Sequence, residues 1–276
     1  MSFIVLMMAI FLEKLSNRRK VLQKDQWWYA QLKRSHRLCA GQPILTLILA
    51  LALPLVGLAL LLSAVQPLIY GLLLIPIHLF IVLYSFSRLD VRASLGPFRD
   101  AWRREDLQAA HLAAQRDLLI QAEDAPGLLQ AVQGYLFWQG FQGFFVVIFF
   151  YVLGGPVAAL GYRLLVLSAE QVQHPAAAGK ATRLLHILDW LPARLLSLSF
   201  ALIGNFITVS KALMPDLLCI REQADSLLNK TGRAAIESPN QADGKQGVLI
   251  LDNAWLLLVR SAVFWYASIA VWTLFF

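Results

Sequence analysis

Hydrophobic residues occur in long runs along this chain, separated by segments that carry most of its charges. Four runs reach the length of a membrane helix, and they cover residues 43–63, 67–86, about 141–161 and about 255–275. About 20 apolar residues in a helix cross the roughly 30 Å hydrocarbon core of a bilayer. The pattern therefore predicts an all-α, polytopic helical membrane protein.

A fifth run, residues 184–208, is apolar but contains Asp189, Pro192 and Arg194. A charge at the centre of a membrane helix costs about 2.5 to 3.5 kcal/mol on insertion scales, so it persists where something in the protein offsets that cost. One interpretation places this segment in the membrane interface, with its charges among the headgroups. The other, which we favour, makes it a span with a buried polar cluster. The sequence thus predicts four to five membrane segments.

In the buried-cluster interpretation, Asp189 and Arg194 face the protein interior and have polar partners. His186 lies three residues before Asp189, so the two share a face of the helix. The candidate partners are Asp189 and Arg194 themselves, across a bend at Pro192, and also His186 and Arg260.

The segments between the runs predict further helices and one loop. Residues 87–135 form a predicted helical insertion on the cytoplasmic side, with an amphipathic helix over 99–122 in which apolar or small residues recur at helical spacing. Turn-forming residues over 229–247 predict a loop. We find no internal repeat and treat 1–276 as a single membrane domain. The recurring positions are Leu107, Ala110, Ala114 and Leu118.

Composition agrees with a membrane protein. Hydrophobic residues make up 58% of the chain and charged residues 15%, and the mean hydropathy is +0.61, whereas about a quarter of the residues of a soluble domain are charged. The net charge of +7 comes from basic residues beside the runs, at 12–42, 87–135 and 209–253. Such residues mark the cytoplasmic side and contact anionic lipid. We therefore expect these regions in the cytoplasm, the 64–66 turn outside, and the lipid bilayer rather than nucleic acid as partner.

Motifs for catalysis or metal binding are weak. The Gly179–Lys180 pair does not form a P-loop, because His174 stands where the first glycine belongs and Ala181 follows the lysine. The histidines lie in unlike contexts, and the two cysteines have no metal-ligand spacing. The sequence predicts neither a catalytic nor a metal site, and it identifies no cofactor.

Two stretches carry a resemblance to a known family: "GGPVAALGYRLL" (154–165) and "HPAAAGKATRLLHILDWLPARLLSLSFALIG" (174–204). They resemble the AmpE family, inner-membrane proteins linked to induction of chromosomal β-lactamase. More distantly, they resemble the CobD/CbiB family of cobalamin biosynthesis, to which "ESPNQADG" (237–244) is also similar. The residues that match are Gly154, Gly155, Tyr162, Leu188, Leu191, Pro192, Ala193, Arg194 and Leu195, with Ser238, Pro239 and Asn240 in the third stretch.

The resemblance implies a multi-pass protein of the bacterial inner membrane. It implies a non-catalytic regulatory or signal-transducing role connected with β-lactamase induction and cell-wall status, with other membrane proteins or cell-wall-derived ligands as partners. The candidate ligand- or partner-binding residues are Gly154, Gly155, Tyr162, Arg163, His174, His186, Asp189, Pro192, Arg194, Ser238 and Asn240.

The alternative is an ATP-dependent membrane ligase that resembles adenosylcobinamide-phosphate synthase. Such chemistry needs Mg²⁺, which proteins hold through carboxylates and substrate phosphates. The enzymes of that family carry an acidic motif before the Gly-Gly span, but residues 138–150 contain no carboxylate here. The sequence therefore favours the regulatory function.

Overall fold

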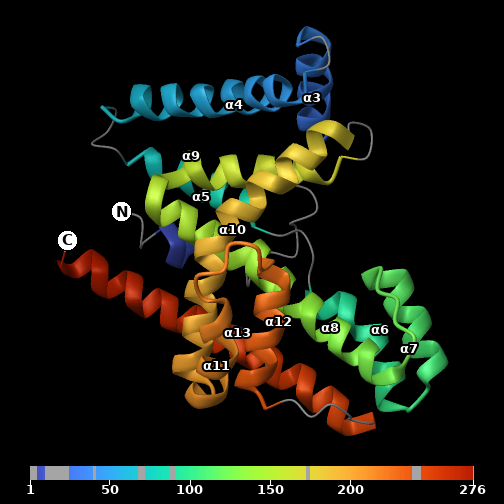
Figure 1. The fold of residues 1–276 in the computed structure, drawn as a ribbon. Coiled ribbons are helices and arrows are strands. Elements are labelled where there is room, and N and C mark those ends of the chain that lie inside the picture. The colour runs from blue at the N-terminus through green and yellow to red at the C-terminus, as the bar shows by residue number, and fades with distance from the viewer. Residues whose placement is uncertain are drawn as a thin grey trace. The chain divides into compact units, whose positions relative to one another are not determined.

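Regular structure in the computed structural model consists of helices throughout the residues that it describes, which are 5–9, 25–39, 42–67, 72–86, 91–171, 175–237 and 244–275 (Figure 1). The chain divides into two compact units. Unit 1 comprises Met1–Arg88 and Val146–Leu188, and unit 2 comprises Leu89–Phe145 and Asp189–Phe276. The predicted all-α class is confirmed.

In unit 1, the apolar helices α4 and α9 pack on each other. Helix α4 contacts both α3 and α9, and α5 packs along α9. Figure 1 shows α3 running crosswise to α4. A Cβ added to Gly161 of α9 would lie 3.4 Å from Leu55 of α4, which is an ordinary van der Waals contact, so the two helices pack side by side at this position. The helices are α3 (Gln26–Leu38), α4 (Pro43–Val65), α5 (Leu74–Ser85), α9 (Val146–Ala169) and the first half of α10 (Pro175–Ile203).

Two hydrogen bonds join the elements of unit 1 through tyrosine hydroxyls. Tyr84 of α5 donates to Oδ1 of Asp25 over 3.0 Å, and both residues are buried. His78 Nδ1 and the hydroxyl of Tyr151 lie 3.0 Å apart and join α5 to α9. Polar groups in an apolar interior are costly unless they are paired, so these contacts help to fix where α5 lies.

Replacing Tyr84 with phenylalanine tests the first of these contacts. The change removes a hydrogen bond to a buried carboxylate, and we expect the protein to lose about 1.5 kcal/mol of stability. Thermal unfolding in detergent measures this. The control is Tyr29→Phe, at an exposed position of α3, which should change stability by less than about 0.5 kcal/mol. Equal melting temperatures for the two variants would contradict the assignment.

In unit 2, helix α12 packs against α8 and α11, and α13 packs against α6 and α8. Gly232 of α12 lies on the ring of Phe137 in α8, where an added Cβ would come within 2.6 Å of ring carbons. The elements are α6 (Val91–Arg103), α7 (Leu107–Ala113), the π-helical turn η2 (Ala114–Leu118), α8 (Ala125–Gly140), the π-helical turn η3 (Phe141–Phe145), the second half of α10, α11 (Phe206–Leu213), the 3-10 turn η4 (Met214–Asp216), α12 (Ala224–Ala235) and α13 (Gly244–Phe275).

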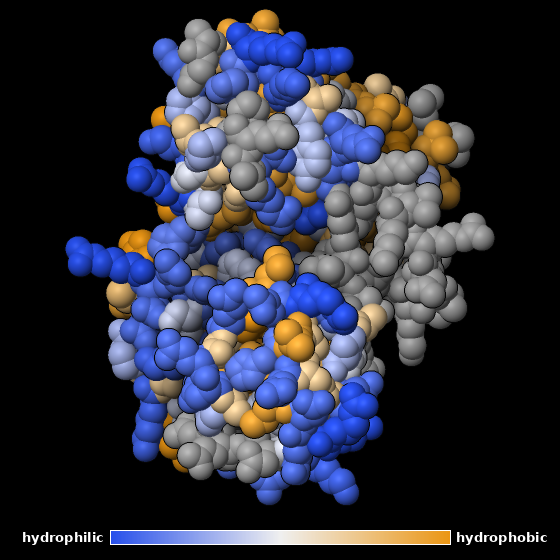
Figure 2. Space-filling view, turned by 90° about the vertical axis from the view of Figure 1, so that its right-hand side faces the viewer, coloured by the Kyte–Doolittle hydropathy of each residue, from blue (hydrophilic) through white to orange (hydrophobic). Residues whose placement is uncertain are grey.

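Side-chain caps explain where several unit 2 helices begin. Asp106 accepts a hydrogen bond from Ala109 N at the start of α7, and Asp124 accepts one from Gly127 N at the start of α8. These caps satisfy amide groups that a helix leaves unpaired at its N-terminus. The surface over α6 and α7, in the lower part of Figure 2, is largely hydrophilic.

Two sequence predictions about this unit are wrong. The helix predicted over 99–122 is interrupted, because Glu105 has a φ of 61° and Asp106 then starts a new helix. The loop predicted over 229–247 is helical up to Ala235 and again from Gly244. Tertiary packing overrides the turn-forming composition of this segment. Leu227, Leu228, Thr231 and Ala235 of α12 are buried.

Among the residues that the structure describes, four helical segments are long and apolar enough to cross a membrane: Pro43–Val65, Ala125–Ala169, Pro175–Ile203 and Gly244–Thr273. The helix in the predicted span 67–86 is shorter, because it covers Leu74–Ser85. The predicted span 184–208 ends early as well, since α10 stops at Ile203 and α11 begins at Phe206. The predicted span 255–275 belongs to a helix that begins at Gly244.

Candidate functional site

From Leu184 to Leu202, helix α10 has one apolar, exposed side and one buried side that carries polar residues. The exposed side repeats every three or four residues, and its side chains are 37% to 65% exposed. Asp189, Arg194, Ser197 and Ser199 lie on the rest of the helix and are at most 3% exposed. A helix in water shows the opposite arrangement, whereas ionisable residues in a membrane helix face the protein. The exposed residues are Leu184, Ile187, Leu191, Leu195, Leu198 and Leu202.

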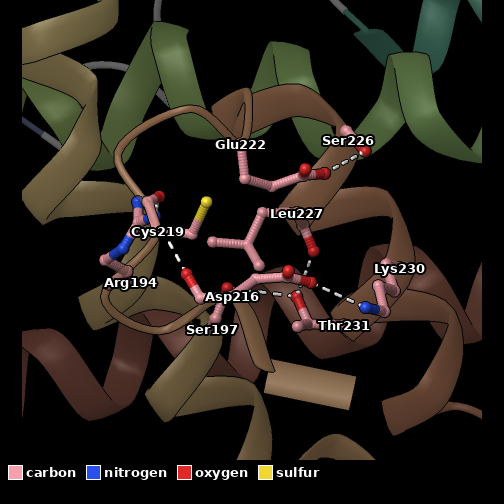
Figure 3. A network of polar contacts seen from close by, with 9 residues as sticks. All are labelled: Arg194, Ser197, Asp216, Cys219, Glu222, Ser226, Leu227, Lys230 and Thr231. Atoms are coloured by element: carbon pink, nitrogen blue, oxygen red, sulfur yellow. Dashed lines mark hydrogen bonds and ion pairs between the residues drawn. The ribbon is translucent and has the colours of Figure 1, made fainter. Parts of the chain in front are cut away.

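Arg194 binds the segment that connects α11 to α12, which we call the 214–223 loop. Its Nε donates to the main-chain oxygen of Leu217 over 2.7 Å. Its Nη2 donates to the main-chain oxygens of Asp216, over 3.1 Å, and of Cys219. Figure 3 shows the guanidinium beside this loop. Arg194 thus holds three carbonyl groups of the loop with one planar side chain.

Two contacts within α10 complete the surroundings of Arg194. Nη1 donates to the main-chain oxygen of Trp190 over 2.9 Å, and the guanidinium carbon lies 4.4 Å from the centre of the Trp190 ring. A guanidinium has five N–H groups, and four of them are used in these bonds. The stacked ring adds a cation–π attraction. Most N–H donors of Arg194 are therefore bonded within the protein itself. We say that Arg194 braces the 214–223 loop, meaning that these bonds hold the loop in place.

Three further polar contacts extend from the 214–223 loop and α10 to α12 (Figure 3). The Asp216 carboxylate pairs with Lys230 Nζ at 2.7 Å, and Ser197 Oγ lies 3.1 Å from Thr231 Oγ1. Ser226 donates to the carboxylate of Glu222 over 2.6 Å at the start of α12. The ion pair is partly exposed and contributes little to stability. Arg194 makes three charge-assisted hydrogen bonds to the loop, so we expect it to contribute more to holding the loop than this ion pair does.

These contacts decide part of the sequence hypothesis. Asp189 and Arg194 are both buried, as predicted. The described hydrogen bonds of Arg194 go to main-chain oxygens rather than to Asp189 or His186. Arg260, the other proposed partner, has an exposed side chain on α13. Arg194 thus holds the 214–223 loop instead of pairing with Asp189 across Pro192. The helix continues through this proline.

The second group of predicted site residues lies at a break in α9. Gly154 has φ −133° and ψ 17°, and Gly155 has φ 67° and ψ −159°, neither of which is helical. The conformation of Gly155 is essentially confined to glycine. After the break, buried Tyr162 stacks on the Phe150 ring with centroids 5.3 Å apart. Half-buried Arg163 follows.

The remaining predicted residues divide between the units or lie outside the described residues. His186 is half-buried and belongs to unit 1, as do Tyr162 and Arg163, whereas Asp189, Pro192 and Arg194 belong to unit 2. The other three predicted residues, His174, Ser238 and Asn240, lie outside the described residues.

Sequence reasoning missed Trp190, Asp216, Leu217 and Cys219, the partners of Arg194. They contribute main-chain oxygens and a ring face, and every residue has a carbonyl, so no residue type marks these positions. The sequence could have indicated only that a buried arginine needs acceptors. In the part of the chain that the structure describes, no group of three or more histidine, cysteine or acidic residues could hold a metal ion.

Long apolar helices, one with its polar residues turned inward, define a polytopic helical membrane protein. The family model "Regulatory signalling modulator protein AmpE" matches residues 1–244, and the chain belongs to this family. It is similar to "Protein AmpE" of Shigella flexneri, with 27% identity over 215 residues, which cover 74% of each chain. No solved structure matches it. The protein is thus a regulatory membrane protein, and these comparisons support neither the CobD/CbiB resemblance nor the ligase alternative.

Proposed function

We propose that this protein acts in the bacterial inner membrane as a non-catalytic signal-transducing component that connects cell-wall status to β-lactamase induction. Family membership supports the regulatory part of this proposal. The link to β-lactamase follows from the resemblance of the 154–165 and 174–204 stretches to the AmpE family. We further propose that the basic regions 12–42, 87–135 and 209–253 face the cytoplasm, because positive charge concentrates on that side.

The hydrogen bonds of Arg194 are the observation that supports a non-catalytic role. An arginine that binds a phosphate or a carboxylate presents its planar fork to the ligand. Here four of the five N–H groups of Arg194 are bonded to main-chain oxygens. The arrangement is suited to holding a surface in a fixed shape rather than to polarising a substrate.

The surface in question is the 214–223 loop. Leu218 is 81% exposed and Ile220 is 64% exposed, on either side of Cys219, whose carbonyl Arg194 holds. These two exposed apolar side chains, on a loop that Arg194 holds in place, support a contact site for another molecule. We propose that this loop contacts a membrane-protein partner or a cell-wall-derived ligand. Gly154, Gly155, Tyr162, Arg163 and His186 remain candidates for a second contact site in unit 1.

Complementation in a strain that carries an inducible chromosomal β-lactamase tests the proposal. The strain lacks its own copy of the gene and receives either the wild-type protein or the double variant Leu218→Ala with Ile220→Ala. β-lactamase activity is measured after exposure to a β-lactam. We expect the wild type to restore the induction response and the double variant to restore much less of it at equal membrane abundance.

The matched control is Leu112→Ala with Leu119→Ala. These two leucines of the same unit are 66% and 87% exposed and lie away from the loop in the sequence. The control should restore induction like the wild type. A strain whose induction does not change when the gene is deleted would contradict the regulatory role. Full complementation by the loop variant would exclude the loop as the contact site.

A further inference from the structure

Helix α3 of unit 1 has a buried face and an exposed face of distinct composition. Trp28, Leu32 and Ser35 are at most 1% exposed and pack into the unit. The exposed face begins with two aromatic residues, Trp27 at 44% and Tyr29 at 39%. It continues toward the C-terminus with three exposed basic residues, Lys33, Arg34 and Arg37. The sequence from Gln26 to Leu38 contains no acidic residue.

The position of α3 places that face at a membrane boundary. Helix α3 ends at Leu38, and α4 begins at Pro43. Helix α4 is the most apolar candidate span, and most of it is exposed to the surroundings. Figure 1 shows α3 crosswise to α4. If α4 crosses the bilayer, a helix that runs crosswise at its end lies along the membrane surface.

The charges of this face lack protein partners among the described contacts. Neither Lys33, Arg34 nor Arg37 takes part in an ion pair within the residues that the structure describes. In Figure 2 the surface over α3, at the top of the view, is largely hydrophilic. Three unneutralised cations on one short helix attract a surface of negative charge.

We propose that α3 is an interfacial helix that binds the headgroups of anionic phospholipids. Lys33, Arg34 and Arg37 contact the phosphates, and Trp27 and Tyr29 lie among the headgroups. Tryptophan and tyrosine favour this layer because their rings are apolar and their N–H and O–H groups stay hydrated. Basic residues beside a membrane helix bind anionic lipid electrostatically. The charge of the exposed face is complementary to that of the lipid, and the face is continuous with an apolar span.

The test titrates the purified full-length protein in a neutral detergent with fluorescent phosphatidylglycerol, and separately with the matching phosphatidylcholine. The variant Lys33→Gln, Arg34→Gln, Arg37→Gln removes three charges. We expect the wild type to bind phosphatidylglycerol more tightly than phosphatidylcholine. The variant should lose about five-fold in affinity for phosphatidylglycerol for each charge removed and should bind phosphatidylcholine as before.

Two control variants distinguish the effect of the charges on α3 from the effect of the net charge of the protein. The variant Arg103→Gln, Arg104→Gln, Lys245→Gln removes the same charge at exposed positions of unit 2 and should lose much less of the lipid preference than the α3 variant. The variant Lys33→Arg, Arg34→Lys, Arg37→Lys keeps the charge of α3 and should keep the lipid preference. Circular dichroism and size-exclusion chromatography confirm that each variant is folded.

Three results would overturn the proposal. The first is an unchanged preference for phosphatidylglycerol in the α3 glutamine variant. The second is an equal loss in the unit 2 variant, which would mean that net charge alone attracts the lipid. The third is tighter binding of a single-stranded oligonucleotide than of phosphatidylglycerol by the wild type, which would assign the basic face to nucleic acid.

Discussion

Replacing Arg194 with alanine should lower the stability of the protein by about 3 kcal/mol, because three partly buried loop carbonyls lose charge-assisted hydrogen bonds at once. These carbonyls belong to Asp216, Leu217 and Cys219. Arg194→Lys keeps the charge but not the planar fork, so it should recover only part of the loss. Thermal unfolding in detergent gives both values.

The matched control is Arg183→Ala, at an exposed position of the same helix. It should change stability by less than about 0.5 kcal/mol. Limited proteolysis adds a local measurement, since the 214–223 loop should be cut much faster in Arg194→Ala than in the control. If the two variants have the same melting temperature and the loop resists cleavage equally in both, Arg194 does not brace the loop.

The second large effect is expected at Gly155. Alanine there should cost about 2 to 3 kcal/mol, because a side chain is strongly disfavoured at a φ of 67° and a ψ of −159°. An added Cβ would meet no neighbouring atom within 4 Å, so the cost comes from the backbone and not from a clash. A loss in apparent melting temperature measures it.

Gly57→Ala is the control, with the opposite expected sign. Gly57 lies inside helix α4, where a Cβ also meets nothing within 4 Å. Alanine in a regular helix is more favourable than glycine by roughly 0.5 to 1 kcal/mol. Gly57→Ala should therefore stabilise the protein slightly. A stabilising Gly155→Ala would show that α9 passes through this position as a regular helix.

The helical class of the protein could be predicted because its signal is strong and local. Runs such as 43–63 are too long and too apolar for another structure in lipid, where every backbone polar group needs an internal partner. Helix ends were harder to predict. Residues 229–235 contain Asn229 and Gly232, which favour turns, but packing against α8 and α11 makes them helical. Local composition cannot report a contact with a distant helix.

The burial of the charged residues in the candidate site could be predicted from the energetic cost of a charge in a membrane segment, but their partners could not. The cost of a charge in a membrane segment predicted that Asp189 and Arg194 would be buried, and both are. The same argument could not find the loop partners of Arg194, because three of its four acceptors are main-chain oxygens more than 20 residues away in sequence. Pairing charges by residue type suggested Asp189 instead. A buried arginine can be satisfied without any acidic side chain.

We expect α10 to cross the membrane with its leucine-rich stripe toward lipid and its polar residues toward protein, since its length and composition suit a membrane span. From Leu184 to Leu202 the stripe is about 27 Å long, since a helix rises 1.5 Å per residue, which is close to the thickness of the hydrocarbon core. One measurement tests this directly. Single nitroxide labels are placed in turn at the six stripe positions, in a protein whose Cys39 and Cys219 are serine, and the protein is reconstituted in bilayers.

We expect labels at Ile187, Leu191, Leu195 and Leu198 to relax strongly with oxygen, which concentrates in lipid, and weakly with a water-soluble nickel chelate. Oxygen accessibility should be greatest near the middle of the stripe and decline toward Leu184 and Leu202. The contradicting result is strong relaxation by the nickel chelate along the whole stripe, which would place α10 in water or at the membrane surface.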